Sequence, residues 1–364
     1  MNINIESSLV QSFIHEINSS GIRYCHFKSN SSLPLSMVGE TDLDLLFEPG
    51  SEEDLALIMS KIGCVLFQSP SDRSYDDVFD YIGYDGQLTK PIHFHCHFCL
   101  DIGEKWVKSY HLPWQEDILA SSYRDSATSI FKDSPEWELV LLILRQTTRI
   151  YSSDIFIRKK LPSISAKAKD EFFWLKNQID FSRLDRILND SFSKHCGSSI
   201  RRVIDSNYTP ESFHAIRQDV LSELSKYRKY SQFRAASKFY SRKVFHYLKK
   251  RLTFIERFSP GRRTLNGPGF ALIVVGTDGS GKTTVCRRIV SNLLKKVSIE
   301  YVYLGHGKSG ASPLFLFLTR SLGYLHRRSP KRLNFFRNLL GLLIVLRRLY
   351  FLRLTKSLDR KSVV

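Results

Sequence analysis

The sequence contains no apolar run long enough to cross a membrane. Its longest charge-free apolar stretch, residues 339–346, is under about ten residues, whereas a spanning helix needs ~20. Residues 1–20 are polar and mixed and lack the apolar core of a secretory signal. The six cysteines of a chain without an export signal are expected to be reduced thiols. These absences predict a cytoplasmic protein without a disulfide framework.

Acidic residues are scarce in most of the chain. Residues 1–136 hold about 9 Lys and Arg against about 21 Asp and Glu, and the rest holds about 45 against about 15, giving a net charge of +18. The length is enough for about two or three domains, and this asymmetry predicts different roles for the two parts. The basic part favours an anionic partner, which is a nucleotide, a nucleic acid or an anionic membrane face.

One short segment carries most of the functional information. It fits the pattern G-x-x-x-x-G-K-[ST] and consists of Gly276, Thr277, Asp278, Gly279, Ser280, Gly281, Lys282, Thr283 and Thr284. The apolar, β-branched residues 270–275 predict a buried parallel strand before it, and the apolar spacing across 284–296 predicts a helix behind it. In such a unit, loop amides converge on phosphate at the helix N-terminus.

The pattern predicts a role for each residue of this loop. We expect Lys282 to reach the β- and γ-phosphates of ATP, and the Thr283 hydroxyl to bind Mg²⁺. Asp278 places a carboxylate in an anion-binding loop, which indicates either a specific contact that offsets the repulsion or a cap of the following helix. The rest of the cofactor-binding set is Gly276, Thr277, Gly279, Ser280, Gly281 and Thr284.

The loop resembles that of thymidylate kinases and their relatives, through Gly-x-Asp-Gly-Ser-Gly-Lys-Thr-Thr at 276–284. In that family the loop carboxylate contacts the sugar of the phosphate-accepting nucleotide. The resemblance implies an ATP-dependent phosphotransferase with Lys282 and Asp278 as catalytic residues and a nucleotide or phosphorylated small molecule as acceptor. Only about 95 residues follow the linker at 261–269, which predicts a partial P-loop domain.

A second segment, residues 39–47, contains Asp42 and Asp44 on a strand predicted at 43–47. Residues two apart on a strand point to one face, and paired carboxylates favour a divalent cation. With the preceding residues 27–30, this order resembles the nucleotidyltransferase fold of the polymerase-β type, although Lys28-Ser29 stands where that family has Gly-Ser. The resemblance implies a second Mg²⁺ site at Asp42 and Asp44.

Three histidines, His93, His95 and His97, share one face of a strand predicted at 92–99. Three interpretations of that face remain open. The histidines ligate a transition metal, they lie beside Asp42 and Asp44, or they are solvated without a ligand role.

The patterns divide the chain into an α/β multidomain protein. The predicted parts are a nucleotidyltransferase-like α+β domain at 1–135, a helical domain at 136–260, a linker at 261–269 and a partial P-loop domain with a parallel sheet at 270–364. Predicted helices lie at 7–19, 137–150, 167–174, 183–188 and 212–227, and further strands at 24–27 and 78–83. The combination resembles fused proteins of bacterial surface-polysaccharide gene clusters.

Residues 226–263 interleave basic and aromatic side chains. They favour stacking on nucleic acid, an amphipathic helix on an anionic leaflet, or a helix packed on a neighbour. No recognisable nucleic-acid module accompanies them, so nucleic acid is disfavoured.

Three functional hypotheses remain open. The first is an incomplete P-loop phosphotransferase, and the second is a metal-dependent nucleotidyltransferase acting through Asp42 and Asp44. The third is a non-catalytic nucleotide-binding protein at the inner face of the membrane. The sequence predicts no oligomeric state.

Overall fold

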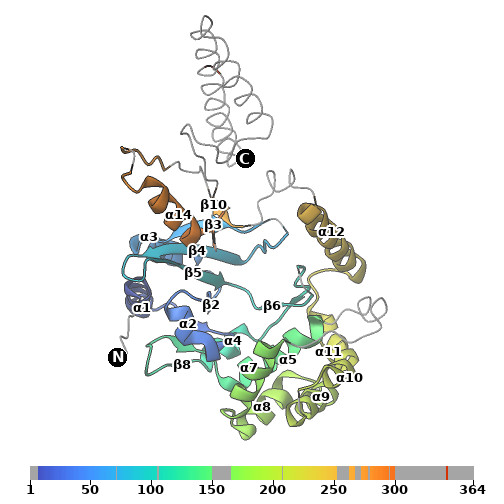
Figure 1. Cartoon of the computed structure of the whole chain (residues 1–364). Helices are drawn as coiled ribbons and strands as arrows, with labels where there is room; N and C mark the ends of the chain where they lie inside the picture. Colours follow the sequence, from blue (N-terminus) through green and yellow to red (C-terminus); the bar gives the residue numbers. More distant parts are fainter. Residues whose placement is uncertain are drawn as a thin grey trace, which may run out of the picture. The chain divides into compact units, whose positions relative to one another are not determined.

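The computed structural model of the chain consists of two compact units, Met1–Arg263 and Thr264–Val364. The residues that it describes are 7–70, 72–104, 106–149, 165–206, 208–251, 262–266, 272–277, 279–294, 296–299 and 342. The first unit combines helices with a mixed β-sheet, so the predicted α/β class is confirmed (Figure 1). In these ranges, no helix is both long enough and apolar enough to cross a membrane.

A mixed sheet forms the centre of the first unit, with its strands in the order β3-β4-β5-β2-β1-β9-β8. These strands are β1 (Tyr24–His26), β2 (Leu43–Phe47), β3 (Val65–Gln68), β4 (Val78–Asp85), β5 (Lys90–His97), β8 (Tyr123–Arg124) and β9 (Phe131–Lys132). The strands β6 (Asp101–Ile102) and β7 (Tyr110–His111) form a separate two-stranded sheet. The strands predicted at 43–47 and 78–83 are confirmed, and β2 runs parallel to β5.

Helices cover the sheet and fill the rest of the first unit. In the N-terminal part these are α1 (Ser8–Ser20), η1 (Asn30–Ser32), α2 (Leu33–Met37), α3 (Glu52–Lys61) and α4 (Gln115–Ala120). After them come α5 (Pro135–Arg149), α7 (Ala166–Lys176), α8 (Phe181–Ser191), α9 (Lys194–Asp205), α10 (Pro210–Ala215), α11 (Arg217–Leu224), η2 (Ser225–Tyr227) and α12 (Gln232–Arg251). The single helix predicted at 212–227 is therefore three short ones, and the others stand within a few residues of their predicted bounds.

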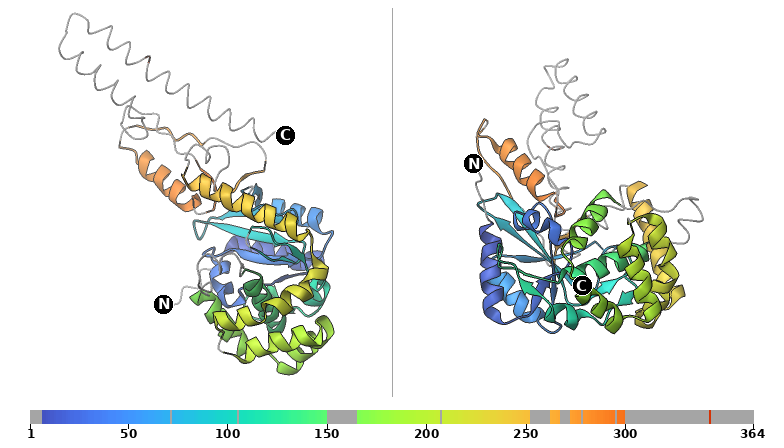
Figure 2. Two further views of the ribbon diagram at one scale, coloured as in Figure 1. Left: turned by 90° about the vertical axis from the view of Figure 1, so that its right-hand side faces the viewer. Right: turned by 90° about the horizontal axis from the view of Figure 1, so that it is seen from below.

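One face of the sheet is apolar and packs against α1 and α3, which lie side by side (Figure 2). Strand alternation sends every second side chain to this face. The resulting core contains Phe13, Leu43, Leu45, Phe47, Leu55, Met59, Phe94 and Cys96, all of them buried. The intervening positions of β2 and β5, which include Asp44 and the three histidines, consequently lie on the opposite face.

A second core joins the other face of the sheet to the helical region. Its members include Cys25 and Leu46 from the sheet and Leu139, Phe172, Ile200 and Phe213 from α5, α7, α9 and α10. The segments predicted as separate domains at 1–135 and 136–260 thus share buried apolar contacts within one compact unit. This contact surface brings α5 and α7 next to the loop that follows β1.

The amphipathic helix α12 buries part of its aromatic content. Ala235 and Phe239 are buried against Val107 and the partly buried Trp106. Other aromatic side chains of the same helix remain exposed, among them Phe233, Tyr240 and Tyr247. Packing on a neighbour therefore accounts for one side of α12 only.

In the second unit, the described elements are β10 (Thr264–Leu265) and α14 (Lys282–Leu293). The helix predicted behind the phosphate-binding loop is confirmed. The buried strand predicted at 270–275 differs from the structure, because residues 272–277 form no strand and Ile273 and Val275 are exposed. A buried parallel strand needs neighbouring strands on both sides, and the described part of this unit supplies none beside it.

Candidate functional site

The polar face of the sheet gathers ionisable side chains from three adjacent strands. In the strand register, Asp44 of β2 lies opposite His95 of β5, and His95 lies opposite Asp80 of β4. Paired positions in neighbouring strands project to the same face. The central imidazole is therefore flanked by a carboxylate on each side.

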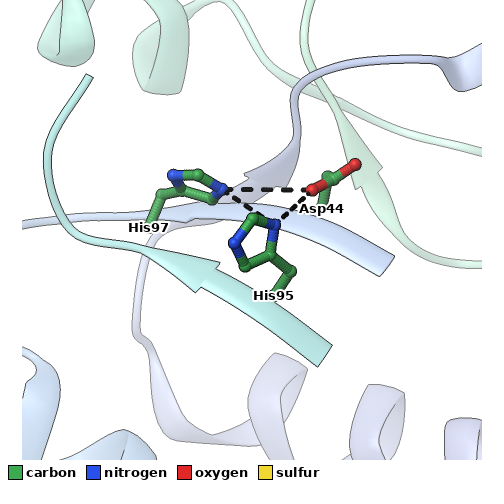
Figure 3. Close-up of side chains that lie close together, drawn as sticks. All are labelled: Asp44, His95 and His97. Carbon is green, nitrogen blue, oxygen red and sulfur yellow. Dashed lines mark hydrogen bonds and ion pairs between the residues drawn. The ribbon is translucent and has the colours of Figure 1, made fainter. Parts of the chain in front are cut away.

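Asp44, His95 and His97 come closest together (Figure 3). The Asp44 Oδ1 atom lies 2.8 Å from His95 Nδ1 and 3.9 Å from His97 Nε2. His97 Nε2 lies 3.3 Å from His95 Nδ1. Among the described residues, these three side chains form the group whose ligand atoms all lie within 4.8 Å of one another. The structure thus places the histidines beside Asp44, which was one of the open readings of the sequence.

Lys28 supplies the positive charge of this cluster. Its Nζ lies 2.8 Å from Asp44 Oδ1 and 3.4 Å from His97 Nε2. Burial favours the neutral form of Asp44, but the Lys28 ammonium and the His95 contact hold its pKa well below the ordinary value. Burial, followed by the charge of Lys28, lowers the pKa of Lys108 to about 7. The carboxylate is therefore ionised, with two lysines near it.

Both imidazoles of the cluster are neutral at pH 7. Burial lowers the pKa of His95, and burial together with the Lys28 charge takes the pKa of His97 well below its usual range. A neutral imidazole keeps a lone pair on one ring nitrogen. That lone pair is what a metal ion or a transferred proton would use.

Asp42 takes part in a different set of contacts. Its Oδ1 lies 2.9 Å from His93 Nδ1, and His93 Nε2 lies 2.7 Å from Asp80 Oδ1. Burial opposes the charged form of His93, yet the two carboxylates together raise its pKa. Arg263 Nε lies 3.0 Å from the same oxygen of Asp80. Asp42 and Asp44, predicted as one metal pair, thus contact two different histidines.

The loop after β1 is held by carboxylates. The Ser29 N–H donates to Glu171 Oε1 at 3.2 Å, and the Asn30 N–H donates to Glu138 Oε1 at 2.9 Å. Ser29 adopts a left-handed conformation with φ 58°, which turns these amides toward the helices. Both amides already donate to carboxyl groups, so they are not available to donate to a phosphate.

Beneath this loop lies a buried acid pair. The Asn30 side-chain Nδ2 donates to Asp133 Oδ1 at 2.7 Å and to Glu138 Oε2 at 2.8 Å. Burial raises the pKa of Asp133 well above its usual range, with the charge of Glu138 as the next cause, and burial raises the pKa of Glu138 as well. One amide thus bridges two carboxyl groups that resist being charged together.

The phosphate-binding pattern forms an exposed turn ahead of α14. Gly279 and Gly281 adopt φ values of 83° and 80°, which only glycine accepts easily. Lys282 Nζ donates to the Gly276 carbonyl at 2.7 Å and also to the Thr277 carbonyl, so the ammonium folds back over the loop. Asp278 lies outside the described residues. Thr283 and Thr284 lie in the first turn of α14.

Sequence reasoning missed Asp80 as a member of the polar cluster. Asp80 lies opposite His95 because β4 and β5 pair across a loop, residues 86–89, that sets their register. The register depends on the length of the connecting loop, so alternation along the two strands does not by itself give this pair. The contacts of Ser29 and Asn30 with helix carboxylates had no local signal either.

Comparisons of the chain with protein-family models, with curated proteins and with solved structures found no match. The functional proposal therefore rests on the chemistry of the residues themselves.

Proposed function

We propose that the chain binds ATP with Mg²⁺ through residues 276–284 and transfers the terminal phosphoryl group to a nucleotide or phosphorylated small-molecule acceptor. The observation that carries the proposal is the start of α14. This helix begins at Lys282 behind Gly281, and it has neither a side-chain cap nor an acidic residue in its first turn. Within the described residues, no side chain caps the first N–H groups of this helix, and such a helix start favours an anion because the helix dipole attracts negative charge there.

The residues present fit the cofactor. The exposed Lys282 ammonium already contacts the carbonyls of Gly276 and Thr277 in the loop. Because its side chain is flexible, a change of rotamer lets it reach a phosphate oxygen bound at this loop. Thr283 offers a hydroxyl beside it as an Mg²⁺ ligand. When bound, ATP supplies the phosphoryl group. These side chains neutralise and orient the phosphates, which is the main task of a protein in this chemistry.

Nucleotide binding by the full chain tests the proposal. We expect Lys282→Ala to weaken ATP·Mg²⁺ binding by about 10–100-fold, the range for one charge-assisted contact. Arg288→Ala, which removes an exposed cation from the same helix away from the loop, is the matched control and should retain the wild-type affinity. Equal ATP affinity in wild type and Lys282→Ala would refute the proposal.

A second candidate is metal-dependent nucleotidyl transfer at Asp42 and Asp44. It is favoured by the position of Asp44 on β2 in the middle of the sheet, next to a parallel neighbour that carries polar groups. The occupied amides of Ser29 and Asn30 count against a triphosphate on that loop. Pyrophosphate release that disappears in Asp44→Asn would select this candidate. Release that is absent from the wild type would remove it.

A third candidate is a membrane-apposed nucleotide-binding protein without catalysis. Exposed aromatic side chains on the basic helix α12 favour it. Co-sedimentation with vesicles containing anionic lipid, lost in Phe233→Ser, is the expected result. Equal pelleting with neutral vesicles would exclude an anionic membrane as the partner.

A further inference from the structure

Three ligand atoms on adjacent strands lie at separations that suit a small metal ion. The distances among Asp44 Oδ1, His95 Nδ1 and His97 Nε2 are 2.8, 3.3 and 3.9 Å. Donors bound to one tetrahedral ion at ~2.0–2.1 Å lie about 3.3 Å from one another. The observed separations bracket that value, so small side-chain rotations bring all three atoms onto one ion.

We propose that Asp44, His95 and His97 form a binding site for a divalent transition-metal ion of the Zn²⁺ class. Imidazole nitrogens suit zinc, copper, iron and nickel, whereas Mg²⁺ prefers oxygen ligands. A set of two imidazoles and one carboxylate therefore selects the first group. Three protein ligands also leave a coordination position open for water or a substrate atom, as in catalytic rather than structural sites.

The scaffold holds these ligands in place. Asp44 lies on β2 and both histidines lie on β5, and the two strands are hydrogen-bonded neighbours inside the sheet. The backs of the same strands are fixed by the buried residues Leu43, Leu45 and Cys96. Ligands on rigid, buried strands pay little ordering entropy on binding an ion.

Lys28 marks where positive charge is favoured. Its ammonium approaches both Asp44 Oδ1 and His97 Nε2, two of the three ligand atoms. A metal ion entering the cluster displaces this ammonium, and the flexible lysine chain allows it to move aside. The Lys28 ammonium therefore takes the place of the metal ion when no metal is bound, and it competes with the metal ion for Asp44.

This site shares Asp44 with the paired-aspartate Mg²⁺ site that the sequence resemblance implies, but its other two ligands are imidazoles in place of Asp42. Asp42 contacts His93, and it does not belong to the group of three ligand residues. The inference also stands apart from nucleotide binding at residues 276–284. ATP affinity and metal affinity are measured separately, so the failure of one leaves the other in place.

Titration of the full-length, metal-stripped protein with Zn²⁺ and Co²⁺ tests the site. We expect one tight ion per chain in calorimetry and, for Co²⁺, the intense visible absorption of a low-coordinate nitrogen and oxygen site. Asp44→Asn and His95→Gln should each weaken binding by about 10–1000-fold, since each removes one of three ligands. His111→Gln is the matched control. Its imidazole lies 2.9 Å from Asp101, but it belongs to no three-ligand group among the described residues.

Two further measurements make the test decisive. Circular dichroism and thermal melting establish that each variant is folded, and the partly exposed His95 serves if Asp44→Asn does not fold. The double variant Cys99→Ser, Cys286→Ser removes the two thiols that are not buried, so retained binding excludes them as the ligands. Unchanged Zn²⁺ affinity in His95→Gln overturns the proposal. Displacement of Co²⁺ by equimolar Mg²⁺ also overturns it, because the site would then prefer a hard cation.

Discussion

The Nζ atom of Lys28 lies 2.8 Å from Oδ1 of Asp44, the oxygen that also faces His95 and His97. A lysine in this position does two opposite things. It stabilises the charged carboxylate on a partly buried face, and it contacts the same oxygen that a bound metal ion would need. The Lys28 side chain thus sets how strongly an ammonium competes with a metal ion for Asp44.

The first prediction concerns this competition. Replacing Lys28 by Met removes the ammonium while keeping an unbranched side chain of similar length, so we expect Zn²⁺ to bind about tenfold more tightly. Without metal, the variant should be less stable by about 1–3 kcal/mol, because Asp44 loses its charged partner. Calorimetric titration and urea unfolding measure the two effects. Weaker Zn²⁺ binding in Lys28→Met would instead make Lys28 a supporting residue.

The second prediction concerns the packing of β4 against α1. A Cβ atom on Gly83 would lie 2.6 Å from Cys64 Sγ and 2.6 Å from Leu9 Cδ2, inside the buried core. Gly83→Ala should therefore lower the free energy of unfolding by about 1–3 kcal/mol. Gly86→Ala is the matched control on the adjoining turn, since nothing lies within 4 Å of its added Cβ. We expect its change to stay within about 0.5 kcal/mol in urea unfolding.

The third prediction concerns Asp85, which ties the hairpin turn to the start of α1. Its Oδ2 accepts from the Ser7 hydroxyl at 2.7 Å and from the Leu9 N–H at 2.9 Å, and its Oδ1 accepts from the Leu88 N–H at 2.7 Å. Asp85→Ala leaves these donors without their acceptor, at a cost of about 1–3 kcal/mol at pH 7.

The pH dependence of the Asp85 contribution follows from the same contacts. Burial works to raise its pKa, but the N–H groups of Leu88 and Leu9 and the serine hydroxyls hold the pKa below the ordinary value. Between the folded and the unfolded pKa of Asp85, the folded state therefore binds fewer protons than the unfolded state. The stabilisation is full above the unfolded pKa of ~3.9 and is lost as the pH falls through the folded pKa. Wild type and Asp85→Ala should converge in stability toward low pH, and a constant difference down to the folded pKa would contradict this account.

The fourth prediction concerns the acid pair bridged by Asn30. Burial and the neighbouring Glu138 raise the pKa of Asp133, so the folded state holds protons that the unfolded state has released. Stability must then fall as the pH rises from about 4 toward the raised pKa values. Asp133→Asn keeps an oxygen for the Asn30 amide and removes the charge, so its stability should depend less on pH. Urea unfolding midpoints measured across this pH range give the slope of stability against pH.

The control for the acid pair is Asp170→Asn, which neutralises an exposed carboxylate on α7. It should leave the wild-type slope unchanged. If Asp133→Asn and Asp170→Asn both keep that slope, the pair is not the source of the pH dependence.

Local patterns in the sequence determined which side chains share a strand face and where a turn leads into a helix. Alternation along β5 predicts that His93, His95 and His97 share one face of that strand, and the strand pairing agrees with it. The glycines and Lys282 of the phosphate-binding pattern predict a turn that leads into a helix, and α14 begins there. Such features depend on residues near one another in the chain, so periodicity and turn chemistry reveal them.

Only the tertiary structure decided which faces meet. The parallel pairing of β2 with β5 places Asp44 opposite His95, and no local signal specifies that partner. The amides of Ser29 and Asn30 point at carboxylates of α5 and α7, more than a hundred residues later in the chain. The apolar run at 272–275 was predicted as a strand from its own residues, but it forms none. A strand also needs neighbouring strands, which the run itself does not supply. Contacts between distant segments arise from burial of the whole core, which local spacing does not encode.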